Sequence, residues 1–249
     1  MSVFASSSFN AGSNIDLASF TPEIGGPWVD HPHANYTTPF SVDSGTGRIY
    51  SIATAAYYVD TDPGTPDYYA EGDFYHASTI SQNIAICVRM DTTADTMYIV
   101  RLNGGTVWEM RRTVASAAAT LTGGTSTSNL PSVGNFTRGR FVVNGDQLSF
   151  YVYVAGVLES TPIIGPITDT NITAAGCAGV RNAGAASSTT GMHLDNFAAG
   201  TLDADLVIAN ALHAHAAENV VLDAAPVARL GYIPRRALRP AIFTPGNPR

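Results

Sequence analysis

Residues 147–154 alternate strictly between two kinds of side chain, and this period of two constrains the fold more than any other feature of the sequence. A period of two places successive side chains on opposite faces of a β-strand. Residues 139–144 form a second strand-like run, and Asn144-Gly145 between them is a dipeptide that favours a tight hairpin. The pattern therefore predicts a hairpin with one face in a core, and the side chains expected in that core are Leu148, Phe150, Val152 and Val154.

Turn-forming residues divide most of the remaining chain into short strand-like segments. They include Asp62-Pro63-Gly64, Asn103-Gly104-Gly105 and Asn182-Ala183-Gly184. The predicted strands are 48–53, 55–59, 68–77, 84–90, 96–102, 107–114, 139–144, 147–154, 157–160, 175–181 and 192–198. No long helical pattern occurs before residue 203. About a dozen short strands at this spacing indicate an all-β fold, an antiparallel β-sandwich or jelly roll, over residues 1–202.

Residues 203–249 have a different composition and form a predicted second region. Residues 203–222 are apolar and fit a helix or an extended segment, and the two alternatives stay open. The residues that follow combine arginine, proline and apolar side chains, with no acidic residue after Asp223. Proline excludes a regular helix or a central strand there, so we expect an extended arm that lies on another protein. The side chains expected to bind that partner are Tyr232, Ile233, Arg235, Arg236, Leu238, Arg239 and Phe243.

Composition excludes several classes of function. The net charge of −7 argues against nucleic acid as the main partner, because phosphate binding needs a basic surface. No apolar run approaches the roughly 20 residues of a membrane-spanning helix. The first ten residues do not resemble a secretory signal, so we expect the protein to be made and kept in a cytoplasm, or to leave it by lysis. Cys87 and Cys177 are therefore expected as buried thiols, with a disulfide between them as the alternative.

Several short segments, taken in order, resemble concanavalin A-like (laminin-G-like) jelly-roll domains of bacterial and phage proteins. They include residues 17–28, 87–91, 143–152, 176–181 and 194–197, and the resemblance spans about residues 4–202. Residues 211–222 separately resemble a segment of phage virion proteins. The resemblance implies a virion structural protein, on the head or the tail, whose residues 203–249 bind a major capsid or tail protein. Copies of the chain are then expected to associate in the particle. The alternative is a carbohydrate-binding adhesion module that binds host-surface glycans.

A possible hydrolytic motif lies in the strand predicted at 68–77. Jelly-roll glycosidases that resemble this fold carry Glu-x-Asp-x-x-Glu on one strand, whereas this chain has Glu71, Asp73 and then His76. Glycoside hydrolysis needs a carboxyl group that donates a proton to the leaving group, and the third position lacks it. We therefore expect no enzymatic activity, and we interpret the segment as a polar strand at the edge of the sandwich.

The remaining candidates concern metals and sugars. His31-Pro32-His33 and His213-Ala214-His215 could each present two imidazoles, but no further ligand is patterned nearby, so we expect hydrogen-bonded histidines, no metal and no cofactor. Tyr151 and Tyr153 share the face opposite the predicted core and could stack on a sugar. They could equally cover that face beneath a loop or a neighbouring subunit.

Overall fold

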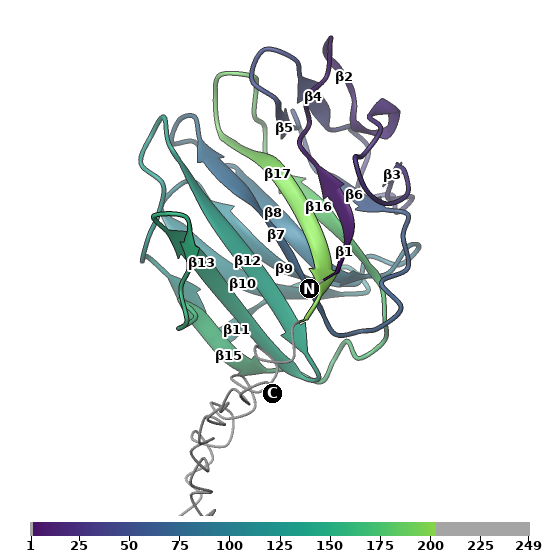
Figure 1. The fold of residues 1–249 in the computed structure, drawn as a ribbon, viewed down its shortest axis with the longest axis vertical. Coiled ribbons are helices and arrows are strands. Elements are labelled where there is room, and N and C mark those ends of the chain that lie inside the picture. The colour runs from purple at the N-terminus through teal and green to yellow at the C-terminus, as the bar shows by residue number, and fades with distance from the viewer. Residues whose placement is uncertain (1, 203–249) are drawn as a thin grey trace, which may run out of the picture.

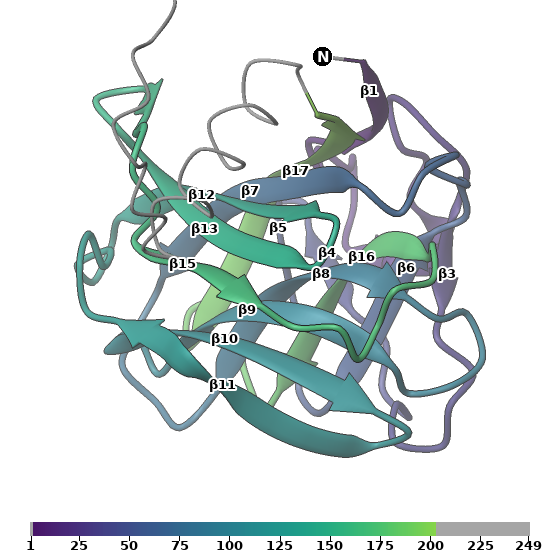
Figure 2. The same cartoon turned by 90° about the horizontal axis from the view of Figure 1, so that it is seen from below.

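Two antiparallel β-sheets packed face to face make up the part of the chain that the computed structural model describes, residues 2–202 (Figure 1). Figure 2 shows the two layers edge-on. The predicted all-β sandwich is thus confirmed. The predicted arm and the domain boundary at residue 202 stay predictions, because residues 203–249 lie outside the described residues.

The first sheet has ten strands, with the order β14-β13-β12-β7-β17-β5-β4-β2; β1 also pairs with β17, and β15 with β13. Its strands are β1 (Val3–Ser7), β2 (Ile15–Asp16), β4 (Ser41–Asp43), β5 (Arg48–Tyr50), β7 (Tyr68–His76), β12 (Phe136–Asn144), β13 (Gln147–Val154), β14 (Val157–Leu158), β15 (Ile164–Thr168) and β17 (Met192–Thr201). Strand β7 lies in the interior of this sheet, paired along its length with β12 on one side and β17 on the other.

The second sheet has seven strands in the order β11-β10-β9-β8-β16-β6-β3. They are β3 (Trp28–Asp30), β6 (Ala55–Val59), β8 (Asn83–Met90), β9 (Met97–Asn103), β10 (Val107–Val114), β11 (Ala117–Ser126) and β16 (Cys177–Ala183). A single 3-10 turn, η1 (Leu17–Ser19), accounts for the helical residues in the described part. None of its helices has the length and apolar character needed to cross a membrane.

The predicted hairpin is present, and its register places three of the four predicted apolar side chains in the core. Leu148, Phe150 and Val152 are fully buried. The prediction for Val154 was wrong, since its side chain is 44% exposed. The ladder between β12 and β13 ends at Val152, and Val154 pairs only with Val157 in the short β14 hairpin. Alternation gives the face of a residue, but burial also requires cover from the opposite sheet.

Aromatic rings fill the middle of the sandwich. Trp108 of the second sheet lies 5.0 Å from Phe74 and 5.1 Å from Phe150 of the first, measured between ring centroids. Gly139 on β12 leaves room for this cluster, because a Cβ at that position would lie 2.4 Å from the Phe150 ring. The core therefore depends on the absence of a side chain at Gly139 as well as on the large aromatic rings.

Most predicted strands are present with ends shifted by a few residues, but several strands were not predicted. Strand β11 is the longest of these, and its small side chains give no alternating apolar pattern. Cys87 and Cys177 are both free and buried, as expected.

Candidate functional site

The outer face of the ten-stranded sheet carries a layer of charged and aromatic side chains. Strand β7 directs Tyr68, Ala70 and Phe74 into the core, so the period of two directs Glu71 and Asp73 outward. Both carboxylates are nevertheless buried, at 7% and 8% exposure. Their neighbours on the same face must therefore supply the hydrogen bonds and opposite charges that replace hydration.

Glu71 has three charged or polar partners. Its register partner on β12 is Arg140, whose Nε donates to Oε2 at 2.7 Å. Arg138 donates to Oε1 at 2.8 Å, and the Tyr153 hydroxyl donates to Oε2 at 2.7 Å. Burial by itself would raise the pKa of Glu71, but the two guanidinium groups outweigh it and hold that pKa below its usual value. Glu71 is thus a fixed, ionised carboxylate rather than a proton donor.

Arg138 links Glu71 to the second carboxylate. It lies opposite Asp73 in the register and donates from NH1 to Oδ1 at 2.9 Å. The other Asp73 oxygen accepts a hydrogen bond from Asn196 Nδ2 at 2.9 Å. Burial tends to lower the pKa of Arg138, and the two carboxylates raise it well above its usual value. Opposite charges placed directly across two strands stabilise this arrangement.

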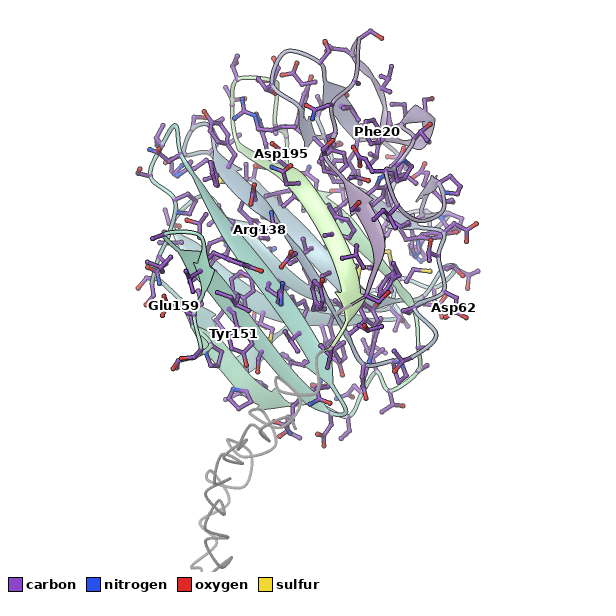
Figure 3. All side chains as sticks on the ribbon, viewed as in Figure 1. Phe20, Asp62, Arg138, Tyr151, Glu159 and Asp195 are labelled. Atoms are coloured by element: carbon purple, nitrogen blue, oxygen red, sulfur yellow. The ribbon has the colours of Figure 1, made fainter. Side chains whose placement is uncertain are left out.

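A β-bulge in β17 brings two more polar groups to this face. The pairing of β17 with β7 shifts register between Asp195 and Ala198, and Asn196 adopts a left-handed φ of 47°. An extra residue in one strand changes the direction of the side chains that follow. Asp195 and Asn196 consequently both line the outer face, and Phe197 returns to the core. Figure 3 shows Asp195 and Arg138 on the same side of the sheet.

The carboxyl group of Asp195 has a pKa above its usual value. It pairs in register with Asp73, so two carboxyl groups face each other across β17 and β7. Desolvation, followed by repulsion from Asp73, raises the pKa of Asp195 to about 6. This carboxyl group gains and loses a proton near neutral pH.

A cavity of about 450 Å³ opens next to these residues. Its walls are formed by Asp73, Arg138 and Tyr153 together with Phe136 and the turn at Ala155-Gly156. The Phe136 side chain is 63% exposed, which is unusual for a phenyl ring. The cavity therefore combines fixed hydrogen-bonding groups with an exposed aromatic ring.

The predicted position of Glu71 and Asp73 was wrong, although the two residues do lie at the candidate site. They occupy an interior strand of the sheet, not its edge. His76 falls on the opposite face, because β7 keeps a regular register with β12 from Tyr68 to Tyr75. The His76 ring is buried, and its nitrogens are bonded to the Pro131 carbonyl and the Thr79 hydroxyl.

The two tyrosines predicted as a sugar platform have different surroundings. Tyr153 lines the cavity and donates to Glu71. Tyr151 is only 2% exposed and packs with Tyr69 and Val142, and its role in glycan binding stays a prediction. Its position two residues earlier in β13 places it farther along the strand from the cavity wall.

The histidine candidates in the described residues have hydrogen-bonding roles. His31 is buried, and its Nε2 lies 2.8 Å from the Asp91 carbonyl, while His33 contacts Asn35 and Ser116. Within residues 2–202, no three His, Cys, Asp or Glu side chains gather closely enough to hold a metal. The second histidine pair, His213 and His215, lies outside the described residues. So do all seven residues predicted to bind a partner.

Sequence reasoning identified Glu71, Asp73 and Tyr153 but missed the rest of the site. The missed side chains are Arg48, Phe136, Arg138, Arg140, Asp195 and Asn196. Alternating arginines at 138 and 140 on a strand were the available signal, because they place two cations on one face. The register that sets them against Glu71 and Asp73 was not visible in the sequence.

Comparisons with known proteins identify the fold of the chain but not its family. No family model matches the sequence, and no curated protein matches it. The structure is similar to the exoplasmic/lumenal domain of VIP36 in its Ca2+/Man2-bound form, with a TM-score of 0.52, 10% identity, and coverage of 76% of this chain and 86% of that one. It is also similar to the GH43 BlXynB protein from Bacillus licheniformis, with a TM-score of 0.50, 12% identity, and coverage of 79% and 39%. The carbohydrate-binding module CBM66 from Bacillus subtilis aligns with a TM-score of 0.47, 14% identity, and coverage of 72% and 94%.

These likenesses define the class of the fold. The chain has a lectin-like jelly-roll β-sandwich of the concanavalin A type. The similar structures include a domain solved with bound Man2 and a GH43 protein of which this chain covers 39%. The function of this chain therefore has to be argued from its own side chains.

Proposed function

We propose that this protein is a carbohydrate-binding module whose binding site is the outer face of the ten-stranded sheet. The observation that carries the proposal is the cavity of about 450 Å³, where the exposed Phe136 ring stands beside Arg138, Asp73 and Tyr153. An exposed ring offers a stacking surface for the apolar face of a sugar. The guanidinium group of Arg138 and the carboxylate of Asp73 are fixed by their mutual hydrogen bond and can bond to the hydroxyl groups of the sugar.

Binding, rather than hydrolysis, is the activity that the charges favour. Glu71 is ionised and fully engaged by Arg138, Arg140 and Tyr153, which leaves it unsuited to protonating a leaving group. The position three residues after Asp73 directs a histidine into the protein interior. A rigid network of this kind pre-organises a surface for a ligand, which lowers the cost of ordering on binding.

The fold supports the same proposal. The VIP36 structure to which this chain is similar was solved in a form bound to Man2. A jelly-roll sandwich therefore provides a suitable scaffold for sugar recognition, although the residues that carry it here must be tested directly.

The test is binding of the full-length protein to an array of neutral and anionic glycans, followed by calorimetric titration of the glycans that bind. Phe136→Ala should reduce affinity about tenfold or more, because it removes the stacking surface. Ile52→Ala is the matched control, since the Ile52 side chain is 64% exposed and lines none of the cavities around Arg138. Absence of binding to every glycan would overturn the proposal, as would equal losses in the two variants.

The virion hypothesis remains a second proposal, supported by the sequence of residues 203–249. An arm rich in arginine, proline and apolar side chains suits attachment to a capsid or tail protein. The two proposals are compatible, because a particle could display the sandwich as a glycan-binding domain. Cosedimentation of the full-length chain with assembled particles, compared with a chain lacking residues 224–249, tests the attachment.

A further inference from the structure

Three cavities on the outer face share wall residues, so they lie next to one another, and together they are called the groove. The cavity of about 450 Å³ shares Asp73 and Phe136 with a smaller one of about 90 Å³, whose other walls include Arg48, Tyr75 and Asp195. A third cavity, of about 280 Å³, lies beside residues 6–8 and Glu23. Arg138 joins this third cavity to the first, and Asn196 joins it to the second.

The groove runs across strands rather than forming one closed pocket. Its walls come from β13 and β12 at one end, from β7 and β17 in the middle, and from β5 and β1 at the other end. The first cavity alone lies within the range of about 300–1,000 Å³ typical of pockets for drug-sized ligands. With its two neighbours, the groove offers more room than a single sugar ring requires.

Each section of the groove contains its own hydrogen-bonding groups. The first has Arg138 and Tyr153, and the smallest has Asp195 beside Arg48, whose guanidinium lies 3.6 Å from the centroid of the Tyr75 ring. The third has the hydroxyl groups of Ser6 and Ser8 with the Glu23 carboxylate, which accepts from the Ser8 backbone N–H at 3.0 Å. The Ser7 hydroxyl is buried and accepts from Trp28 Nε1. The bulge at Asn196 is what turns two consecutive polar side chains toward the middle of the groove.

Charge in and beside the groove is mixed, with a small excess of carboxylates. Arg48, Arg138 and Arg140 lie among four carboxylates, those of Glu23, Glu71, Asp73 and Asp195. Mixed charges of this kind can bond to hydroxyl groups as donors and as acceptors, and the small excess of carboxylates disfavours an anionic ligand.

We infer that the groove binds a neutral oligosaccharide chain along its length, over at least two and up to three consecutive sugar units, rather than a single terminal sugar. The inference rests on the proposed carbohydrate-binding function and specifies its ligand. The Phe136 ring, common to two sections, is the stacking surface. Asp195 and Asn196 hold hydroxyl groups of the neighbouring unit, and the Ser6–Ser8 section takes the unit beyond.

The test is calorimetric titration of the full-length protein with size ladders, from one to six units, of β-1,4-linked glucose, β-1,4-linked xylose, α-1,2-linked mannose and α-1,4-linked galacturonic acid. For at least one neutral ladder, affinity should rise about tenfold or more between the monosaccharide and the trisaccharide and then level off. Asp195→Asn and Glu23→Gln change single sections of the groove conservatively. Each should reduce the gain in affinity between the monosaccharide and the trisaccharide, whereas Ile52→Ala, outside the groove, should leave that gain unchanged.

The outcomes separate the inference from the proposed function. A monosaccharide that binds as tightly as the longer members would overturn the chain-binding inference and leave the proposed function standing. Tighter binding of the galacturonic acid ladder than of every neutral ladder would overturn the neutral specificity. Failure of all ladders, together with failure on the glycan array, would overturn the proposed function and the inference with it.

Discussion

Asp73 on β7 and Asp195 on β17 are directly paired across the two strands, yet only Asp73 has an arginine partner at hydrogen-bond distance. Arg138 and Asn196 hold the Asp73 carboxylate, while Asp195 accepts a hydrogen bond from the Asn196 backbone N–H at 2.6 Å. Arg138 and Asn196 fix the Asp73 carboxylate in place, and Asp73 in turn repels the Asp195 carboxylate. The sheet thereby gives two identical side chains different hydrogen-bonding partners.

Asp195 should make the protein less stable as pH rises toward neutrality. Its pKa is about 6 in the folded protein, against a usual value of 3.8. A raised folded-state pKa means that the contribution to stability is full below about pH 4 and is lost as pH rises through 6. Asp195→Asn should therefore unfold with a free energy about 1–2 kcal/mol higher than the parent at pH 7 and nearly equal at pH 3.5, after allowance for the partial exposure of the group.

The measurement is urea denaturation of both proteins between pH 3.5 and 7.5. Glu71 acts in the opposite direction, because its pKa is lowered and its contribution is lost on acidification. The difference between parent and variant, rather than either curve, therefore reports on Asp195. Ile52→Ala, a change at an exposed and uncharged side chain, is the control and should give a difference that does not change with pH.

Removal of Arg138 should destabilise the protein strongly. Arg138→Met leaves Asp73 and one oxygen of Glu71 buried without their guanidinium partner. Loss of one member of a buried ion pair costs about 3–5 kcal/mol, and the 26% exposure of the Arg138 side chain places the expected loss near about 3 kcal/mol. Calorimetric melting measures it. The double variant Arg138→Met/Asp73→Asn should recover part of the loss, and additive losses would contradict the pairing.

Phe150 and Val154 test the difference between strand periodicity and burial. Both lie on the same face of β13, but Phe150 is fully buried and Val154 is 44% exposed. Phe150→Ala should lower the free energy of unfolding by about 3–5 kcal/mol. Val154→Ala should lower it by less than about 0.5 kcal/mol. Chemical denaturation of both variants decides the point, and comparable losses would show that the end of β13 is covered.

Gly139→Ala should destabilise the sandwich although it adds only one methyl group. A Cβ at this position would lie 2.4 Å from the Phe150 ring, so the ring must leave its place between Phe74 and Trp108. The expected loss is about 1–3 kcal/mol, the usual range for overpacking a core. Gly139→Ala/Phe150→Leu should lose less than the sum of the two single changes, and strict additivity would show that the two residues do not compete for space.

Deletion of residues 224–249 should leave the sandwich folded. Among residues 2–202, most core side chains lie on strands of the two sheets, so the expected change in melting temperature is within about 2–3 °C. Calorimetry with and without the segment provides the comparison. A broad or non-cooperative transition in the shortened chain would show that the predicted domain boundary is wrong.

The sequence by itself determined the local structure. Alternation, turn residues and the Asn144-Gly145 hairpin depend on neighbours within a few positions, and these features gave the all-β class, most strands, and the burial of Leu148, Phe150 and Val152. Strand β11 was missed because its alanines, threonines and glycines show no alternation between apolar and polar side chains.

Only the tertiary structure decided the site. Residues 71, 138, 153 and 195 are far apart in the chain, and their meeting depends on the order and register of β13, β12, β7 and β17. Register is a long-range property, and a shift of one residue in β12 would direct Arg138 and Arg140 into the core. The bulge at Asn196 is equally invisible in the pattern, yet it turns Asp195 and Asn196 to the same face. The sequence shows which residues are charged. The pairing of β7 with β12 decides which carboxylate each arginine contacts.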